Sequence, residues 1–396
     1  MNTMVNESSR RDLLKAAATT SASLIAWMAS RGIAFPAMDD GEELVPFLDM
    51  PRTPPNRLDW ETLDAWLTPQ DQVFGVQHYG MPEFDGATHR LEIAGLVDRP
   101  VSLTMDELRA RPKRDLVMTL ECSGNGSSKG FMNAVYNSRW TGTPLLPLLE
   151  ECGIQAGVIE LVFIGRDQQE ETLRPGTARE LKFHVPFGRS MSLADVKRLD
   201  PILAHERNGA PLEKGNGAPV RLIVPGWYGI ANVKWLARIE CRDRRYMGRF
   251  MGRDYVTVRG ERKGDAITFV ETSVTRVNLK SVIARVTRKA TIDGKAPVRV
   301  LGATWDDGTG IARVDVKIDD GPWQPAELAA EPRSKFAWTF FTCDAGSLAP
   351  GKHTLVSRAI DANGRIQPSA SDDEIALKRT YWEAYEQWPR DIEITA

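Results

Sequence analysis

A single cysteine, placed where an apolar run gives way to small residues, constrains this chain more than any other feature. Residues 116–120 are apolar apart from one threonine, which predicts a buried strand. Glu121 and Cys122 come next, and the small residues 123–126 then predict a turn. A sulfur at a strand end, with backbone close by, suits a soft metal or a nucleophilic reaction. A cysteine simply buried in the core before a turn is the alternative that this stretch leaves open.

The composition is that of a soluble globular protein and excludes several kinds of site. The 396 residues predict two or three domains, and the net charge of −2 gives no sign of a nucleic-acid surface. None of the four cysteines lies in a CxxC or CxxCH pattern, so neither a four-cysteine zinc site nor c-type haem attachment is predicted. One disulfide among Cys152, Cys241 and Cys343 remains open.

The first 37 residues have the pattern of an export signal. Arg10 and Arg11 precede a weakly apolar run, residues 16–29, that is rich in alanine, threonine and serine. Paired arginines before such a run are typical of the twin-arginine route, with cleavage expected near residues 34–37. The alternative is an amphipathic N-terminal helix. Because this route carries folded proteins, we expect a periplasmic protein whose cofactor is inserted before export, and no membrane span after signal removal.

The next segment, residues 40–270, alternates short helices with strands and predicts an α+β domain. A proline-rich surface arm is expected over residues 40–57. The expected helices cover residues 104–111, opened by a capping box, and residues 144–152, stopped by Gly153. The expected strands cover residues 89–96, 116–120, 158–164, 219–224 and 232–239. Neither a GxGxxG fingerprint nor a Walker motif is present, so a nucleotide fold has no support.

Two basic residues stand out because they fall inside apolar strands. Arg221 and Lys234 lie thirteen positions apart, on either side of a Pro-Gly-Trp turn. A buried cation needs an anionic partner. An internal salt bridge or an outward-facing position would satisfy each one separately, whereas a shared phosphate would satisfy both.

The last segment, residues 275–396, changes to a strand-rich pattern. Strands are expected over residues 281–286, 298–305, 311–318, 337–341 and 353–360, with a turn at residues 319–321. This spacing predicts a β-sandwich. The aromatic tail is expected to cover a sheet edge or to pack on a neighbour; it contains Tyr381, Trp382, Tyr385 and Trp388.

Four motifs, in order and spacing, make the chain resemble the sulfite oxidase family of molybdenum enzymes. They are Cys122-Ser123-Gly124-Asn125, residues 138–142 (SRWTG), residues 217–227 (GAPVRLIVPGW) and residues 233–236 (VKWL). The resemblance implies a molybdopterin-binding domain over residues 38–272 and an immunoglobulin-like dimerisation domain over residues 273–396, hence a homodimer. A sandwich that binds carbohydrate or a surface is the alternative for the second domain.

The resemblance also implies the site. Cys122 would be the thiolate ligand of molybdenum, and Tyr255 would contact the substrate or the reacting oxygen. Arg221 and Lys234 would hold the pterin phosphate. The implied cofactor-binding positions are Gln77, His78, Cys122, Ser123, Asp167, Asn216, Arg221, Asn232 and Lys234. One molybdenum–molybdopterin per chain is expected, without haem, so electrons would leave to a separate acceptor such as a cytochrome c.

Three positions depart from the family pattern. Val76 and Ser127 stand where the family carries substrate-binding arginines, although Lys129 is close to the second, and Asn216 stands where it carries a histidine. Without these two cations, a dianionic substrate should bind more weakly, by roughly 1.5–3 kcal/mol for each charged hydrogen bond that is lost. Oxidation of sulfite, a small sulfur anion, is still the first expectation and a sulfane sulfur the second. An S-oxide or N-oxide reductase, and a cofactor-free envelope binding protein, are the alternatives.

Overall fold

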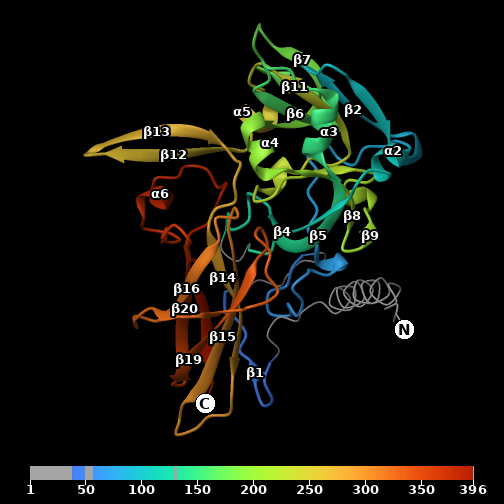
Figure 1. Cartoon of the computed structure of the whole chain (residues 1–396). Helices are drawn as coiled ribbons and strands as arrows, with labels where there is room; N and C mark the ends of the chain where they lie inside the picture. The colour runs from blue at the N-terminus through green and yellow to red at the C-terminus, as the bar shows by residue number, and fades with distance from the viewer. Residues whose placement is uncertain (1–37, 50–56, 129–131, 396) are drawn as a thin grey trace, which may run out of the picture.

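The structure, a computed structural model, describes residues 38–49, 57–128 and 132–395. The predicted export signal and Lys129 lie outside these residues. The chain forms two lobes, with the first domain above and the second below in Figure 1. Both are built mainly from sheet, with few helices, so the α+β fold with a second β-sandwich is confirmed.

One sheet of the first domain carries the helices. Its strands run in the order β3 (Val101–Thr104), β2 (Arg90–Gly95), β11 (Leu236–Arg242), β6 (Glu160–Leu173), β7 (Leu181–Ser192). The helices are α2 (Met105–Arg109), α3 (Leu145–Cys152) and α4 (Leu193–Leu199). The predicted capping box is present, since Thr104 Oγ1 accepts from the Glu107 backbone and Glu107 Oε2 accepts from the Thr104 backbone. Gly153 ends α3 at φ 71°, as expected.

The other sheet of the first domain carries Cys122 at its edge. Its strands run in the order β10 (Arg221–Ile223), β8 (Ile202–Arg207), β5 (Val135–Pro144), β4 (Arg114–Glu121), and the short β9 (Ala210–Pro211) pairs with β8. Leu120 pairs with Tyr136 in the β4–β5 ladder, so Cys122 follows directly where that ladder ends. The buried strand predicted before the cysteine is confirmed.

Two predicted elements are corrected. The strand expected over residues 232–239 begins only at Leu236, because Trp235 adopts φ 48°, which extended backbone cannot accommodate. Lys234 therefore lies in a loop. The arm expected at residues 40–57 includes β1 (Glu43–Leu44), which pairs with β14 (Lys280–Arg288) in the second domain. Residues 50–56 of that arm lie outside the described part of the chain.

The second domain is the predicted sandwich. One sheet has the order β1, β14, β15 (Ala296–Trp305), β19 (Thr339–Leu348), β18 (Glu327–Leu328). The other has the order β17 (Gln324–Pro325), β16 (Ile311–Ile318), β20 (Gly351–Asp361), β21 (Arg390–Ile394). Val314 and Val316 alternate inward along β16 and join the core between the sheets.

A hairpin and a continuous core connect the lobes. The hairpin, β12 (Val256–Lys263) with β13 (Ala266–Ser273), projects from the side of the molecule beside α6 (Asp373–Ala376) (Figure 1). The main hydrophobic core contains residues of both domains, and Trp60 stacks on Trp305 with ring centroids 6.2 Å apart. The two lobes therefore share one packed interior.

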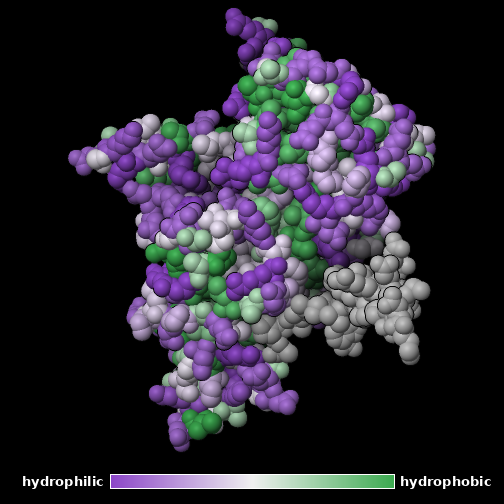
Figure 2. Space-filling view, in the orientation of Figure 1, coloured by the Kyte–Doolittle hydropathy of each residue, from purple (hydrophilic) through white to green (hydrophobic). Residues whose placement is uncertain are grey.

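Hydrophilic residues cover most of the face shown in Figure 2, and hydrophobic ones interrupt them locally. No helix in the described part of the chain is long and apolar enough to span a membrane.

Candidate active site

One cleft brings together every residue predicted for the site. Its lining includes Gln77, His78, Cys122, Ser123, Asp167, Asn216, Arg221, Asn232, Lys234 and Tyr255. These positions are spread over nearly 180 residues of sequence and come from both sheets of the first domain. Their spatial convergence agrees with the prediction, while the role of each remains a proposal.

Backbone contacts fix Cys122 at the edge of its sheet. Its N–H donates to the Ala134 carbonyl at 2.9 Å, and its carbonyl accepts from the Asn125 N–H at 2.9 Å. Gly126 then turns the chain at φ +89°, a conformation that favours glycine. Burial raises the pKa of the Cys122 thiol, so a cationic metal would have to displace its proton. All four cysteines are free, which settles the open disulfide.

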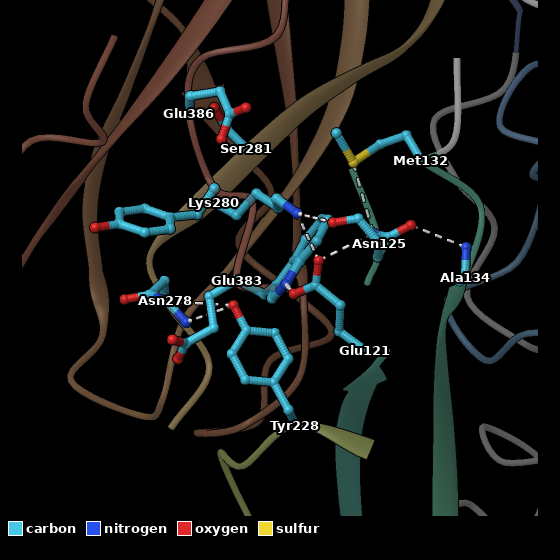
Figure 3. A network of polar contacts seen from close by, with 12 residues as sticks. Glu121, Asn125, Met132, Ala134, Tyr228, Asn278, Lys280, Ser281, Glu383 and Glu386 are labelled. Atoms are coloured by element: carbon cyan, nitrogen blue, oxygen red, sulfur yellow. Dashed lines mark hydrogen bonds and ion pairs between the residues drawn. The ribbon is translucent and has the colours of Figure 1, made fainter. Parts of the chain in front are cut away.

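The residue before Cys122 is anchored to the second domain by a buried polar network (Figure 3). Lys280 Nζ, at the start of β14, lies 2.6 Å from Glu121 Oε1, and both side chains are fully buried. Asn125 donates to the same carboxylate oxygen at 2.9 Å, and Trp305 Nε1 donates to the other at 2.9 Å. The sequence prediction missed this network, although Lys280 follows the same signal as Arg221: a cation in an apolar strand.

Two cations lie at one end of the cleft without a carboxylate partner. The Arg221 guanidinium donates to the carbonyls of Asn216 and Asn232, each at 2.9 Å. Lys234 Nζ donates to the Gly215 carbonyl at 3.0 Å. Neither cation forms an ion pair within the described residues. The internal salt bridge that the sequence left open is therefore not formed there.

Burial makes this positive charge costly. It lowers the pKa of Lys234 to about 7, with nearby Arg221 lowering it further and Asp167 opposing the shift. Burial likewise raises the pKa of Asp167 to about 6. One carboxyl oxygen of Asp167 and Arg221 Nε have no hydrogen-bond partner among the described residues. This end of the cleft is therefore suited to an anionic group that would compensate the two cations.

Asn232 holds the Arg221 guanidinium in place through its backbone carbonyl. Its side chain is used internally, accepting from the Val224 N–H at 2.8 Å and donating to the Tyr228 carbonyl at 3.1 Å. Its own carbonyl remains to hold Arg221. Asn232 thus positions the arginine through its carbonyl, while its side-chain oxygen and one amide N–H are used to hold the local backbone.

Tyr255 and His78 also line the cleft. Tyr255 Oη and His78 Nε2 share a hydrogen bond of 2.7 Å. Burial lowers the pKa of His78 to about 4, with Lys234 adding to the effect, so the imidazole is neutral near pH 7. Burial raises the pKa of Tyr255, which keeps its hydroxyl protonated. Near pH 7 the resting pair is therefore uncharged and shares one proton in its hydrogen bond.

The aromatic tail packs against Tyr255, one of the residues that line the cleft. Trp382 stacks on Tyr255 with centroids 4.2 Å apart, and Tyr381 lies 4.0 Å from Trp382. The Glu383 N–H donates to the Ser123 carbonyl at 2.7 Å, which ties the tail to the cysteine turn. The sequence predicted that the tail covers a sheet edge or packs on a neighbour, but not that it reaches the site. The high density of aromatic residues in the tail was the one sequence signal that could have indicated this contact with the site.

Comparisons with known proteins agree with this geometry. Residues 78–250 match the oxidoreductase molybdopterin binding domain, and residues 271–382 match the Mo-co oxidoreductase dimerisation domain. The chain is 30% identical over 330 residues to the mitochondrial sulfite oxidases of Rattus norvegicus and Homo sapiens. This chain belongs to the sulfite oxidase family of molybdopterin oxidoreductases. The alignments cover 77% of this chain but 58% of those relatives, so the chain spans little more than half of their length.

Within the family, a solved structure resembles the whole described architecture. The sulfane dehydrogenase SoxCD from Paracoccus pantotrophus superposes with a TM-score of 0.69 at 26% identity, covering 89% of this chain and 90% of that one. The sulfite oxidase of Arabidopsis thaliana is 26% identical over 347 residues. The family therefore fixes the fold and the class of cofactor, and leaves the substrate to the residues of this chain.

Proposed function

We propose that this protein is an exported molybdenum enzyme that oxidises sulfite or a related sulfur compound. The observation that carries the proposal is one cleft lined both by the thiol of Cys122 and by two cations, Arg221 and Lys234, that have no carboxylate partner among the described residues. A soft thiolate ligand and a phosphate site are the two attachment points that a phosphorylated pterin carrying molybdenum needs.

The residues present fit this cofactor. Arg221 and Lys234 would hold its phosphate, because an anion there removes the desolvation cost of both cations. Cys122 would bind the metal as a thiolate. When bound, molybdenum supplies two-electron oxygen-atom transfer, and one such cofactor is expected per chain. Ser123, Gln77 and Asn216 line the same cleft and complete its wall.

The protein side of the chemistry is proton and substrate handling. Tyr255 projects from a left-handed backbone position, φ 58°, which directs its ring between His78 and Trp382. We assign to the Tyr255–His78 pair the orientation of the substrate and the transfer of a proton at Tyr255 Oη.

Electrons would leave to a separate one-electron acceptor such as a cytochrome c, since the sequence has no CxxCH motif for attaching its own haem. The twin-arginine pattern supports export to the periplasm with the cofactor already inserted. The matched dimerisation domain supports a homodimer.

Reduction of an S-oxide or N-oxide is the second candidate. It is favoured by Val76 and Ser127, which leave two expected substrate cations absent. A cofactor-free envelope binding protein is the third, and the convergence of Cys122, Arg221 and Lys234 on one cleft argues against it.

A steady-state assay tests the proposal. The molybdenum-loaded protein, with ferricyanide as acceptor, is expected to turn over at least one of sulfite, thiosulfate or an organic sulfide. Activity only with reduced viologen and a sulfoxide or N-oxide would establish the second candidate instead. A molybdenum-loaded protein inert toward all of them would reject the proposal.

A further inference from the structure

Outside the cleft lies a second hollow, here called the outer chamber, which shares His78 and Tyr255 with the cleft. Its described lining consists of His78, Tyr79, Gln169, Arg249, Phe250, Asp254, Tyr255, Tyr381 and Trp382. Most of these side chains are aromatic rings in contact with one another. His78 lies 4.8 Å from Phe250, and Phe250 lies 5.3 Å from Tyr79. A compound approaching Tyr255 from solvent through this chamber passes mainly ring faces and edges.

The aromatic wall continues to the cysteine turn. A Cβ built on Gly124 would lie 3.7 Å from Trp382, 3.7 Å from Tyr381 and 3.9 Å from Cys122 Sγ. The two tail rings therefore stand directly over the turn that carries the sulfur. A substrate bound beside Tyr255 would contact the indole of Trp382.

The chamber's charge is internally balanced. Arg249 is its one cation among the described lining residues, and it pairs with Asp254 at 2.6 Å and with Glu171 at 3.3 Å. Glu171 also pairs with Arg253 at 2.7 Å. Arg189, buried behind Phe250, donates to the carbonyls of Phe250 and Val274. Arg189 is not one of the chamber's lining residues and His78 is neutral, so the described lining residues offer the chamber no unpaired positive charge.

We propose that the substrate of this site is an uncharged sulfur compound of the thioether type, not the sulfite dianion. This inference rests on the proposed function and narrows its substrate. In the reaction, a sulfur–oxygen bond forms and water loses its two hydrogens as protons. The sulfur loses two electrons, which pass singly to two equivalents of a one-electron acceptor, and the product is the sulfoxide.

Two physical effects select such a compound. Sulfur in a thioether makes favourable contacts with aromatic rings and is itself weakly hydrated. A dianion approaching the negative ring faces would lose its hydration without gaining a cation to replace it. The same wall therefore attracts one class of substrate and excludes the other.

The primary test compares kcat/KM for tetrahydrothiophene and for sulfite with the molybdenum-loaded protein and ferricyanide. We expect the thioether to exceed sulfite by at least about tenfold, the size of one aromatic contact. Trp382→Ala should raise the KM for the thioether about tenfold with kcat nearly unchanged, and Trp382→Phe should restore most of it. Trp323→Ala, which removes an indole from the second domain, is the matched control and should change neither constant.

Binding supplies a readout independent of turnover. In saturation-transfer NMR, tetrahydrothiophene 1-oxide should receive saturation from the wild-type protein and much less from Trp382→Ala. An unchanged transfer in that variant would show that the tail does not form the site, and would overturn the inference.

Two variants that change charge test whether the site disfavours a dianionic substrate. Val76 lines the cleft and is 37% exposed, so Val76→Arg should lower the KM for sulfite about tenfold, as one charged hydrogen bond would. Lys129→Ala should leave sulfite kinetics as they are. A loss of sulfite turnover in Lys129→Ala, or sulfite at parity with the thioether, would overturn this inference while the proposed function stood. A molybdenum-loaded protein inert toward every sulfur compound would overturn both.

Discussion

Cys122 carries the central chemical role among single residues, and its removal has a spectroscopic signature. Cys122→Ser replaces a soft ligand by a hard, protonated one, so we expect one sulfur fewer around molybdenum in X-ray absorption. Turnover should fall by about 100-fold or more, a loss comparable to that of an essential metal ligand or its support. Cys343→Ser, a buried cysteine of β19 in the second domain, is the control and should preserve the metal spectrum. An unchanged sulfur count in Cys122→Ser would exclude it as a ligand.

Lys234 gives the cofactor-free protein a characteristic pH dependence. Its pKa is lowered from 10.5 to about 7, so between these values the unfolded chain binds a proton that the folded chain does not. The stability of the cofactor-free protein should therefore rise with pH across this window. Lys234→Met should unfold at a higher temperature at pH 7 and lack this rise, while retaining less cofactor.

Thermal unfolding of cofactor-free protein from about pH 7 to 10.5 checks the expectation. Lys113→Met, which removes an exposed lysine paired with Glu206, is the control and should keep the wild-type slope. Identical slopes in the wild type and Lys234→Met would contradict the buried, uncompensated charge.

The sequence predicted these residues better than it predicted their partners. Cys122, Arg221 and Lys234 were identifiable because each breaks a local pattern: a thiol at a strand end, or a cation among apolar neighbours. Trp382 and Glu121 were not, because an aromatic residue in a tail and a carboxylate beside a cysteine are locally ordinary. Their importance follows from contacts with Tyr255 and Lys280, which are distant in the chain.

At the scale of elements, the second domain holds β4 in place. The Lys280–Glu121 pair is the polar link between β14 and the strand that presents Cys122 (Figure 3). Lys280→Met leaves the Glu121 carboxylate buried and uncompensated, so we expect a loss of about 3–5 kcal/mol in the free energy of unfolding. Adding Glu121→Leu should recover part of this loss, because the double variant removes the stranded charge. Denaturant unfolding measures both.

A solvent-exposed ion pair, Arg262 with Asp373, provides the control for the Lys280–Glu121 pair. Arg262→Met breaks the ion pair with Asp373 on the hairpin side of the molecule, where solvent screens both groups. It should leave stability nearly unchanged. If Lys280→Met were equally neutral, the network would not support β4.

Elements were predictable where local signals act alone. The capping box at Thr104 and the glycine stop at Gly153 both appear where the sequence places them. The strand at 232–239 was predicted too long, because the pairing of Leu236 with Gly165 and the left-handed Trp235 are set by tertiary contacts. Hydrophobic periodicity predicts that a strand is present, but it does not predict at which residue the pairing with its neighbour begins.

At the scale of the molecule, the two domains share one core. Trp60 lies between Trp305 and Trp338 of the second domain, and Leu301 and Ala303 belong to the same cluster as the first domain's interior. We therefore expect a single cooperative thermal transition by calorimetry, with both domains unfolding together. Two separated transitions would contradict the shared core. The domain boundary at residue 272 predicted from the sequence is thus a change of pattern, and it is crossed by continuous packing.

We propose that the cleft of Cys122, Arg221 and Lys234 holds a molybdenum cofactor, and metal analysis measures that occupancy. Protein purified from a host that makes molybdopterin should contain one molybdenum per chain. Arg221→Met combined with Lys234→Met should lose most of it, whereas the surface variant Lys113→Met should not. Wild-type protein without molybdenum, or the double variant with its full complement, would contradict the claim.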